Sequence, residues 1–158
     1  MGVRNLVYRL YERRLEASLS PGAIPTHVGV MVDGNRRWAR SAGFPDVSRG
    51  HQAGADKIFE LLEWCEDAGV QVVTLWLLST DNLARPAAEL EPLLRIIEET
   101  VRELAGQDWN VKPVGALDLL PDETARVLKD VAAETGGNSG LLTVEWGNTK
   151  AEVPVKLA

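Results

Sequence analysis

One stretch of the sequence, an apolar run that ends at an acid and a turn, has residue types suited to binding an anion. Residues 28–32 are apolar and rich in valine, and the run is too short for an independent helix, so we expect a buried strand of a parallel sheet. Asp33 then lies at the carboxyl end of that strand, where ligands bind in open α/β sheets. Gly34 lets a ligand approach the backbone, and Asn35 is expected to be the N-cap of a helix whose first N–H groups attract anions.

Three arginines follow and supply the positive charge that a phosphate needs. Arg36, Arg37 and Arg40 carry planar guanidinium groups whose donors match phosphate oxygens. Asp33 would repel a bare diphosphate, so a cation is expected between them, and Mg²⁺ held by one carboxylate and by phosphate oxygens is the usual arrangement. The alternative is a solvated turn between a strand and a helix, because most surface charges bind nothing. The cluster as a whole favours a Mg²⁺-dependent diphosphate site with Asp33 as its metal ligand.

A second polar cluster follows the strongest predicted strand. Residues 70–78 are β-branched, aliphatic and aromatic, and the polar segment from Ser79 to Asn82 comes directly after them. The carboxyl ends of parallel strands meet at one edge of a sheet, so this segment and Asp33 are expected to face each other across one crevice. The crevice would hold a carboxylate, arginines and the amide of Asn82 between apolar walls.

The composition limits the class of protein. With 158 residues and 45% hydrophobic content, the chain is expected to form one domain over 1–158. The net charge of −6 argues against nonspecific binding of nucleic acid. Cys65 is the only cysteine, which rules out an internal disulfide and fits a reducing cytoplasm. The sequence has no apolar run of about 18 residues and no signal-peptide pattern, so the expected location is cytoplasmic.

An amphipathic helix is predicted at the N-terminal end, over residues 3–19. Its apolar residues, Leu6, Leu10 and Leu15 among them, are interleaved with arginines such as Arg9. We expect this helix to pack on the edge of the domain. The alternative is a peripheral membrane contact, because its basic face suits anionic headgroups.

Helical and strand patterns alternate along the rest of the chain. Helices are predicted over residues 50–68, 87–104 and 122–134, and further strands over 110–115 and 141–146. This alternation predicts the α/β class, a mainly parallel sheet flanked by helices and connected by right-handed crossovers. Read from the sequence alone, the apolar stripes of helices 50–68 and 87–104 are core.

Three motifs in order resemble one family. Residues 27–39 match a long signature, His-Val, four apolar residues, then Asp-Gly-Asn-x-Arg-Trp-Ala. Gly50-His51-x-x-Gly54 is a second match, and residues 79–86, where the family usually reads Ser-Ser/Thr-Glu-Asn-Trp-x-Arg-Pro, are a third. The chain resembles the cis-prenyltransferases, which include undecaprenyl diphosphate synthases and short-chain Z-isoprenyl diphosphate synthases. A weaker similarity runs through residues 110–115 and 135–144.

The resemblance implies a Mg²⁺-dependent enzyme that condenses isopentenyl diphosphate with a short allylic diphosphate and forms a Z double bond. It implies that Asp33 assists departure of the allylic diphosphate and that Asn82 takes part in proton removal. It also implies that helices 50–68 and 87–104 line a tunnel for the growing chain, and that the protein forms homodimers. The substrate-binding residues carried over are Gly34, Asn35, Arg36, Arg37, Trp38, Arg49, His51, Ser79, Thr80, Asp81, Leu83 and Arg85.

The sequence departs from the family pattern at several positions. Asp81 stands where the family has Glu, Leu83 replaces a Trp, and Val47 replaces an Arg whose phosphate contact Arg49 is expected to take over. After residue 144, family members carry a Tyr-Gly-Gly-Arg segment, an Arg-x-Ser-Gly region that binds isopentenyl diphosphate, much of the dimer surface and a Glu that completes the metal site. Residues 145–158 contain none of these motifs, so a C-terminal truncation is expected.

Two alternatives to a complete prenyltransferase therefore stay open. The protein could be an allylic-diphosphate-binding subunit that needs a partner chain for the rest of the site. It could also be a lyase or cyclase that ionises an allylic diphosphate without a second substrate.

Overall fold

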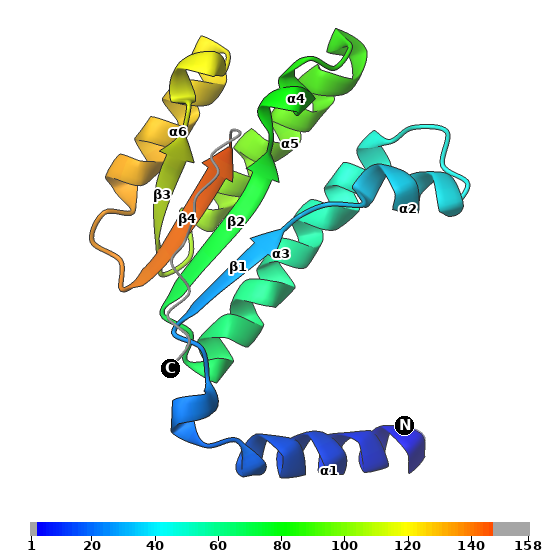
Figure 1. Cartoon of the computed structure of the whole chain (residues 1–158), viewed down its shortest axis with the longest axis vertical. Coiled ribbons are helices and arrows are strands. Elements are labelled where there is room, and N and C mark those ends of the chain that lie inside the picture. The colour runs from blue at the N-terminus through cyan, green and yellow to red at the C-terminus, as the bar shows by residue number, and fades with distance from the viewer. Residues whose placement is uncertain (1–2, 147–158) are drawn as a thin grey trace.

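The computed structural model describes residues 3–146, in which four parallel strands form one sheet (Figure 1). The strands are β1 (His27–Met31), β2 (Val72–Leu78), β3 (Trp109–Gly115) and β4 (Gly140–Trp146), arranged in the order β1-β2-β4-β3. Each lies within two residues of its predicted bounds.

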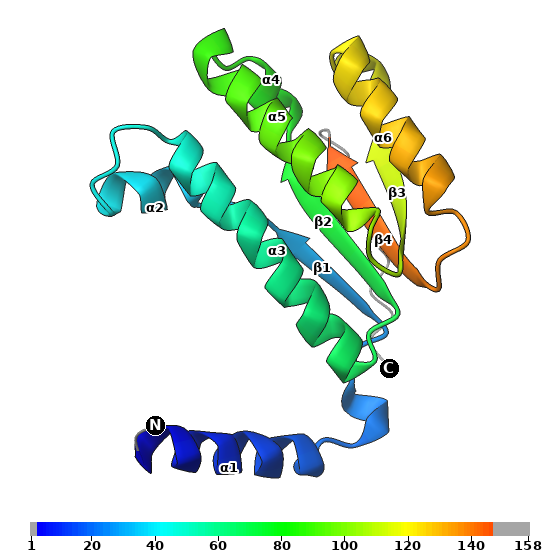
Figure 2. The ribbon, with the colours of Figure 1, turned by 180° about the vertical axis from the view of Figure 1, so that it is seen from behind.

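Three long helices cover one face of this sheet, as Figure 2 shows from behind. They are α3 (Ser48–Ala68), α5 (Ala87–Leu104) and α6 (Asp122–Glu134). The short helices α2 (Asn35–Ser41) and α4 (Thr80–Leu83) follow β1 and β2 directly, and two 3₁₀ turns span Pro21–Ala23 and Leu117–Leu119. The predicted fold class, an α/β protein with a parallel sheet flanked by helices, is confirmed.

The crossovers do not all have the hand that we expected. The step from β2 to β3 passes over the position of β4, and the next step returns from β3 to β4. Helices α5 and α6 pack against each other on the same face of the sheet (Figure 2). Two steps in opposite directions with helices on one face have opposite hands. The prediction of right-handed crossovers throughout is therefore wrong for one of this pair.

The core lies between the central strands and the apolar stripes of α3 and α5. Val73 and Leu75 on β2 are fully buried, as are Leu62 of α3 and Val101 of α5. Burying a side chain of this size contributes about 1.5–3 kcal/mol relative to leaving it exposed, so these residues fix the two helices on the sheet. Cys65 belongs to the same core, and burial raises the pKa of its thiol.

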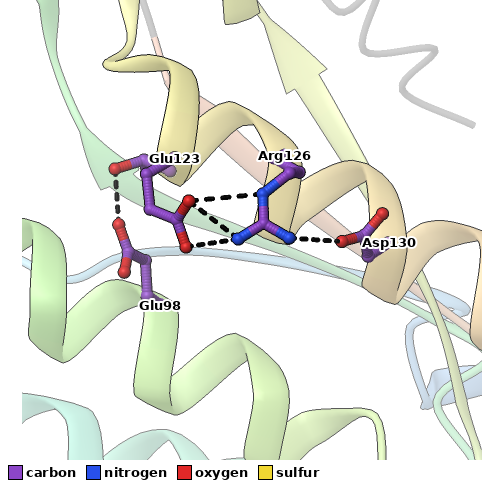
Figure 3. A network of polar contacts seen from close by, with 5 residues as sticks. Glu98, Glu123, Arg126 and Asp130 are labelled. Carbon is purple, nitrogen blue, oxygen red and sulfur yellow. Dashed lines mark hydrogen bonds and ion pairs between the residues drawn. The ribbon is translucent and has the colours of Figure 1, made fainter.

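A buried hydroxyl joins α6 to α5. The side chain of Thr124, which is 2% exposed, donates a hydrogen bond of 2.5 Å to Oε1 of Glu98. On the exposed side of α6, Arg126 binds Glu123 at 2.6 Å and approaches Asp130 at 3.7 Å (Figure 3). The buried bond fixes the start of α6, whereas exposed pairs of this kind contribute little.

The N-terminal helix α1 (Val3–Ser18) forms as predicted but does not pack on the domain. It projects away from the sheet (Figure 1), and its described apolar side chains are exposed, with Leu6, Leu10 and Tyr11 each more than 60% accessible. The expectation that this helix packs on the domain edge is wrong for the described residues, because nothing in them faces its apolar side. No helix within residues 3–146 is long and apolar enough to cross a membrane.

Candidate diphosphate site

A cavity of about 600 Å³ opens at the carboxyl ends of β1 and β2. Asp33, Ser79 and Asn82 line its polar part, and apolar side chains of α3 and α5, such as Ile58 and Ile97, line the rest. The structure thus joins the two predicted polar clusters in one cleft. It also places the helices 50–68 and 87–104 along that cleft, where the resemblance put a tunnel.

The strand register brings the two clusters together. Met31 pairs with Trp76, and the N–H of Val32 donates a hydrogen bond of 3.2 Å to the carbonyl of Trp76. β1 therefore ends level with the last residues of β2, so that Asp33 and Ser79 leave the sheet side by side. This is the crevice expected at the carboxyl edge of a parallel sheet.

The turn after β1 depends on Gly34. This residue has a φ of 89°, in the left-handed region, and it is the N-cap of α2. Asn35 was expected to be the N-cap but is the first residue of the helix, because the left-handed turn comes one residue earlier. The N–H of Gly34 donates a hydrogen bond of 2.6 Å to Oδ1 of Asp33, which orients this exposed carboxylate.

Two glycines let α3 approach this turn closely. A Cβ at Gly50 would lie 2.1 Å from the carbonyl oxygen of Asn35, and a Cβ at Gly54 would lie 2.6 Å from its side-chain oxygen. The spacing of four residues puts both glycines on one face of α3. The second motif therefore acts partly through packing, because its glycines hold the start of α2 against α3.

His51, between these glycines, is buried and faces the cleft. It is 7% exposed, and its Nε2 has no hydrogen-bond partner among the described residues. Burial lowers the pKa of this imidazole, and the positive charge of Arg85 lowers it further. A neutral imidazole that lines an anion site and lacks a partner is suited to a ligand oxygen.

Two arginines in the cleft share a carboxylate that the sequence analysis missed. Arg36 Nε and Arg85 Nη1 each lie 3.1 Å from Oε1 of Glu89, in the first turn of α5. The spacing of Arg85 and Glu89, four residues, was a signal in the sequence. It did not distinguish this pair from an ordinary solvated one.

Asn82 helps to shape the loop after β2. The N–H of Ser79 donates a hydrogen bond of 3.1 Å to Oδ1 of Asn82, and the N–H of Asn82 donates one of 2.9 Å to the carbonyl of Ser79. The amide therefore has a local structural role as well as its place in the cleft. Its predicted part in proton removal stays a prediction.

The cleft collects most of the predicted site residues but not all. Lining it are Asp33, Gly34, Asn35, Arg36, Arg37, His51, Ser79, Asn82 and Arg85, together with Arg40 and Ser41. Trp38 lines a neighbouring, mostly apolar cavity of about 410 Å³ instead. Arg49, Thr80, Asp81 and Leu83 line neither cavity. Substrate contacts of these last residues remain predictions.

Asp33 is the one carboxylate that lines this cleft among the described residues. Among the described residues no three acidic, histidine or cysteine side chains come together as a metal site. Mg²⁺ binds through one or two carboxylates together with substrate phosphates, so Asp33 beside several arginines fits an ion that arrives with a diphosphate.

Comparison with known proteins shows the family. The family model described as putative undecaprenyl diphosphate synthase, of the prenyltransferase type, matches residues 31–150, and the chain belongs to this family. A (2Z,6E)-farnesyl diphosphate synthase of Thermobifida fusca (strain YX) is 63% identical over 136 residues, which cover 86% of this chain and 54% of that protein. Isoprenyl transferase 1 of Streptomyces avermitilis is 50% identical over 141 residues, covering 89% of this chain and 54% of that protein.

A solved structure supports the same assignment. Lavandulyl diphosphate synthase from Lavandula x intermedia, crystallised with dimethylallyl diphosphate, superposes with a TM-score of 0.70 at 28% identity, covering 78% of this chain and 54% of that one. The chain spans about half the length of the curated relatives it matches. The resemblance inferred from the three motifs is confirmed.

Proposed function

We propose that the cleft binds the diphosphate group of a short allylic diphosphate, and that the protein serves to condense this substrate with isopentenyl diphosphate into a Z-prenyl diphosphate. The observation that carries the proposal is the cleft itself, in which Asp33, arginines from two chain segments and an apolar wall meet. A diphosphate head with a hydrocarbon tail matches this distribution of polar and apolar surface.

Each group of residues in the cleft is proposed to have a separate part in the reaction. As the allylic C–O bond breaks, negative charge gathers on the diphosphate, and Arg36, Arg37 and Arg85 are placed to stabilise it. Asp33 would hold Mg²⁺ against the same oxygens, and the ion would supply further stabilisation of the leaving group. His51, whose Nε2 has no partner among the described residues, would donate one hydrogen bond to a phosphate oxygen.

The second substrate belongs to the half of the site that follows β2. In the proposed reaction the double bond of isopentenyl diphosphate attacks the allylic carbon, a C–C bond forms as the C–O bond to diphosphate breaks, and the departing diphosphate accepts the proton that leaves the neighbouring carbon. Ser79 and Asn82 face the cleft beside Asp33, where this second substrate would lie. The names of the relatives, which are synthases and transferases, favour condensation over a lyase or cyclase.

Product analysis separates the candidate functions. Purified protein is incubated with Mg²⁺ and geranyl diphosphate, with and without labelled isopentenyl diphosphate. Condensation predicts a labelled Z-prenyl diphosphate and release of diphosphate only when both substrates are present. Release from geranyl diphosphate alone would contradict condensation and support a lyase. Binding without any turnover would support the subunit alternative, because the chain spans about half of its relatives.

Two further partners are proposed, a membrane surface for α1 and a second copy of the chain. We propose that the apolar side of α1 contacts an anionic membrane surface, since Leu6, Leu10 and Tyr11 are exposed beside the basic Arg9 and Arg13. Sedimentation with vesicles of phosphatidylcholine and phosphatidylglycerol, compared with phosphatidylcholine alone, tests this contact. Protein that stays in the supernatant with both would contradict it. Homodimer formation and a cytoplasmic location are part of the same proposal.

A further inference from the structure

Glu89 connects two chain segments that the cleft needs in fixed positions. Its Oε1 lies 3.1 Å from Nε of Arg36, on the helix after β1, and 3.1 Å from Nη1 of Arg85, in the segment after β2. The side chains of Glu89 and Arg85 are only 17% and 18% exposed, and that of Arg36 is 41% exposed. One carboxylate oxygen thus lies between two guanidinium groups and offsets part of their mutual repulsion.

Glu89 contacts both arginines but is not itself among the residues that line the cleft. Arg36 and Arg85 both line the cavity, whereas Glu89 does not. A diphosphate in the cavity would therefore meet the two guanidinium groups, which line it, and not the carboxylate of Glu89. This arrangement makes Glu89 a candidate for positioning the two arginines and not for binding the ligand itself.

The three contacting atoms also lack other partners. Arg36 Nε, Arg85 Nη1 and Glu89 Oε1 are closed to solvent and make no hydrogen bond within residues 3–146, so they are held at ion-pair distance by charge. Buried polar atoms without a hydrogen bond are rare in proteins, and such an atom is stabilised when it forms a hydrogen bond of good geometry with a partner. A small rotation of either guanidinium on binding an anion would align its N–H groups.

On this basis we propose that Glu89 is a positioning residue, which holds Arg36 and Arg85 together so that one diphosphate group can contact both. The inference rests on the proposed function of the cleft as a diphosphate site. The family signature does not specify this contact, because Arg36 occupies the variable position x in Asp-Gly-Asn-x-Arg-Trp-Ala.

A substitution that keeps the shape of Glu89 but removes its charge gives opposite results under the two roles that this acid can have. Glu89→Gln removes one negative charge beside an anion site. If Glu89 acted only through its charge, the loss would strengthen diphosphate binding, because like-charge repulsion would fall. If Glu89 positions the arginines, binding weakens although the cleft has become more positive, because two flexible side chains must be ordered on binding.

The chain offers a matched control on the same helix. Glu91 is two residues further along α5, its side chain is 66% exposed, and its pair with Arg95 is 3.8 Å long. Glu91→Gln removes the same charge without touching the cleft. Binding of inorganic pyrophosphate in the presence of Mg²⁺ is measured by calorimetry for both variants and for the unmodified protein, and thermal unfolding checks that each is folded.

We expect Glu89→Gln to bind pyrophosphate about tenfold more weakly and Glu91→Gln to bind as the unmodified protein does. In a protein that already carries Arg36→Gln, the further loss on changing Glu89 should be smaller, since one of the two contacts is gone. A general loss of structure would not produce this coupling. Should Glu89→Gln fail to fold, Glu89→Asp, which keeps the charge but shortens the reach, is expected to bind severalfold more weakly.

The outcomes are distinct. Equal or tighter binding by a folded Glu89 variant, with the unmodified protein binding normally, overturns the positioning role alone. Absence of coupling with Arg36 overturns it as well. If the unmodified protein binds neither pyrophosphate nor dimethylallyl diphosphate with Mg²⁺, the proposed function fails, and the role of Glu89 fails with it.

Discussion

Replacing Gly50 by alanine should loosen the contact between α2 and α3, which positions the arginines of the cleft. The new Cβ would lie 2.1 Å from the carbonyl oxygen of Asn35, 2.8 Å from its carbonyl carbon and 3.0 Å from Cβ of Ala39. An ordinary carbon–oxygen contact is about 3.3 Å, so the start of α2 must move by about 1 Å. The obstacle is backbone, which cannot rotate away as a side chain can.

The expected change in the free energy of unfolding of Gly50→Ala follows from two opposing effects. Alanine in place of glycine favours a helix by at most about 1 kcal/mol. Overpacking of a tight contact costs about 1–3 kcal/mol, and the upper part of that range applies when backbone has to shift. We therefore expect Gly50→Ala to lower the free energy of unfolding by about 1–2 kcal/mol. A displacement of about 1 Å in a binding site also weakens function up to about 100-fold.

Urea unfolding, followed by tryptophan fluorescence, measures the stability change, and calorimetry with pyrophosphate and Mg²⁺ measures binding. Gly54→Ala is a milder comparison, because the three atoms nearest to its Cβ all belong to the side-chain amide of Asn35, which can rotate. Gly29→Ala, on β1, is the control, since nothing lies within 4 Å of its Cβ. Unchanged stability and binding in Gly50→Ala, or an equal loss in Gly29→Ala, would refute the reasoning.

Three further predictions follow from buried groups. Burial holds the pKa of His51 below its usual 6.5, so at lower pH the unfolded chain binds a proton at this residue that the folded chain does not. The free energy of unfolding should therefore fall as the pH drops below about 6.5. Urea unfolding at pH 7.5 and 5.5 should show a smaller fall in this free energy for His51→Gln than for the unmodified protein. Thr124→Val should lower the free energy of unfolding by about 1–2 kcal/mol in urea titrations, because Glu98 loses its buried hydrogen-bond donor. A change as small as that caused by the exposed Arg126→Ala would argue against a stabilising role of the Thr124–Glu98 hydrogen bond. Cys65, buried and with a raised pKa, should react with a thiol reagent at pH 8 only after unfolding, so prompt labelling of the folded protein would contradict the packing of α3.

The sequence predicted the elements well because each has a strong local signal. The apolar stripe of helix 87–104 and the short valine-rich run of β1 are patterns with different periods, and both elements formed within a residue or two of the expected bounds. The meeting of Asp33 with the segment after β2 was also predictable, since it needs only that the two strands be parallel neighbours.

Features that depend on distant partners were not predictable. The close approach of α3 to Asn35, through Gly50 and Gly54, joins residues that lie apart in the chain, so no local pattern records it. Glu89 looked like one more solvated acid until Arg36 was placed beside it. The opposite hands of two crossovers depend on where β4 inserts, between β2 and β3, which no local pattern records.

Exposure of α1 is a further example. The amphipathic pattern predicted a helix correctly, because helical spacing of apolar residues is a local property. The burial of its apolar side depends on other parts of a structure, and the described residues contain no partner for Leu6 or Leu10.

The central claim, that Asp33 and the arginines bind a prenyl diphosphate together with Mg²⁺, is tested most directly by calorimetry with dimethylallyl diphosphate. Affinity is measured with and without Mg²⁺ for the unmodified protein and for Asp33→Asn. We predict that Mg²⁺ strengthens binding by the unmodified protein and has little effect on Asp33→Asn. Without Mg²⁺ the variant should bind at least as tightly, because a repelling carboxylate is gone. The same Mg²⁺ dependence in both proteins, or no binding in either, would contradict the account.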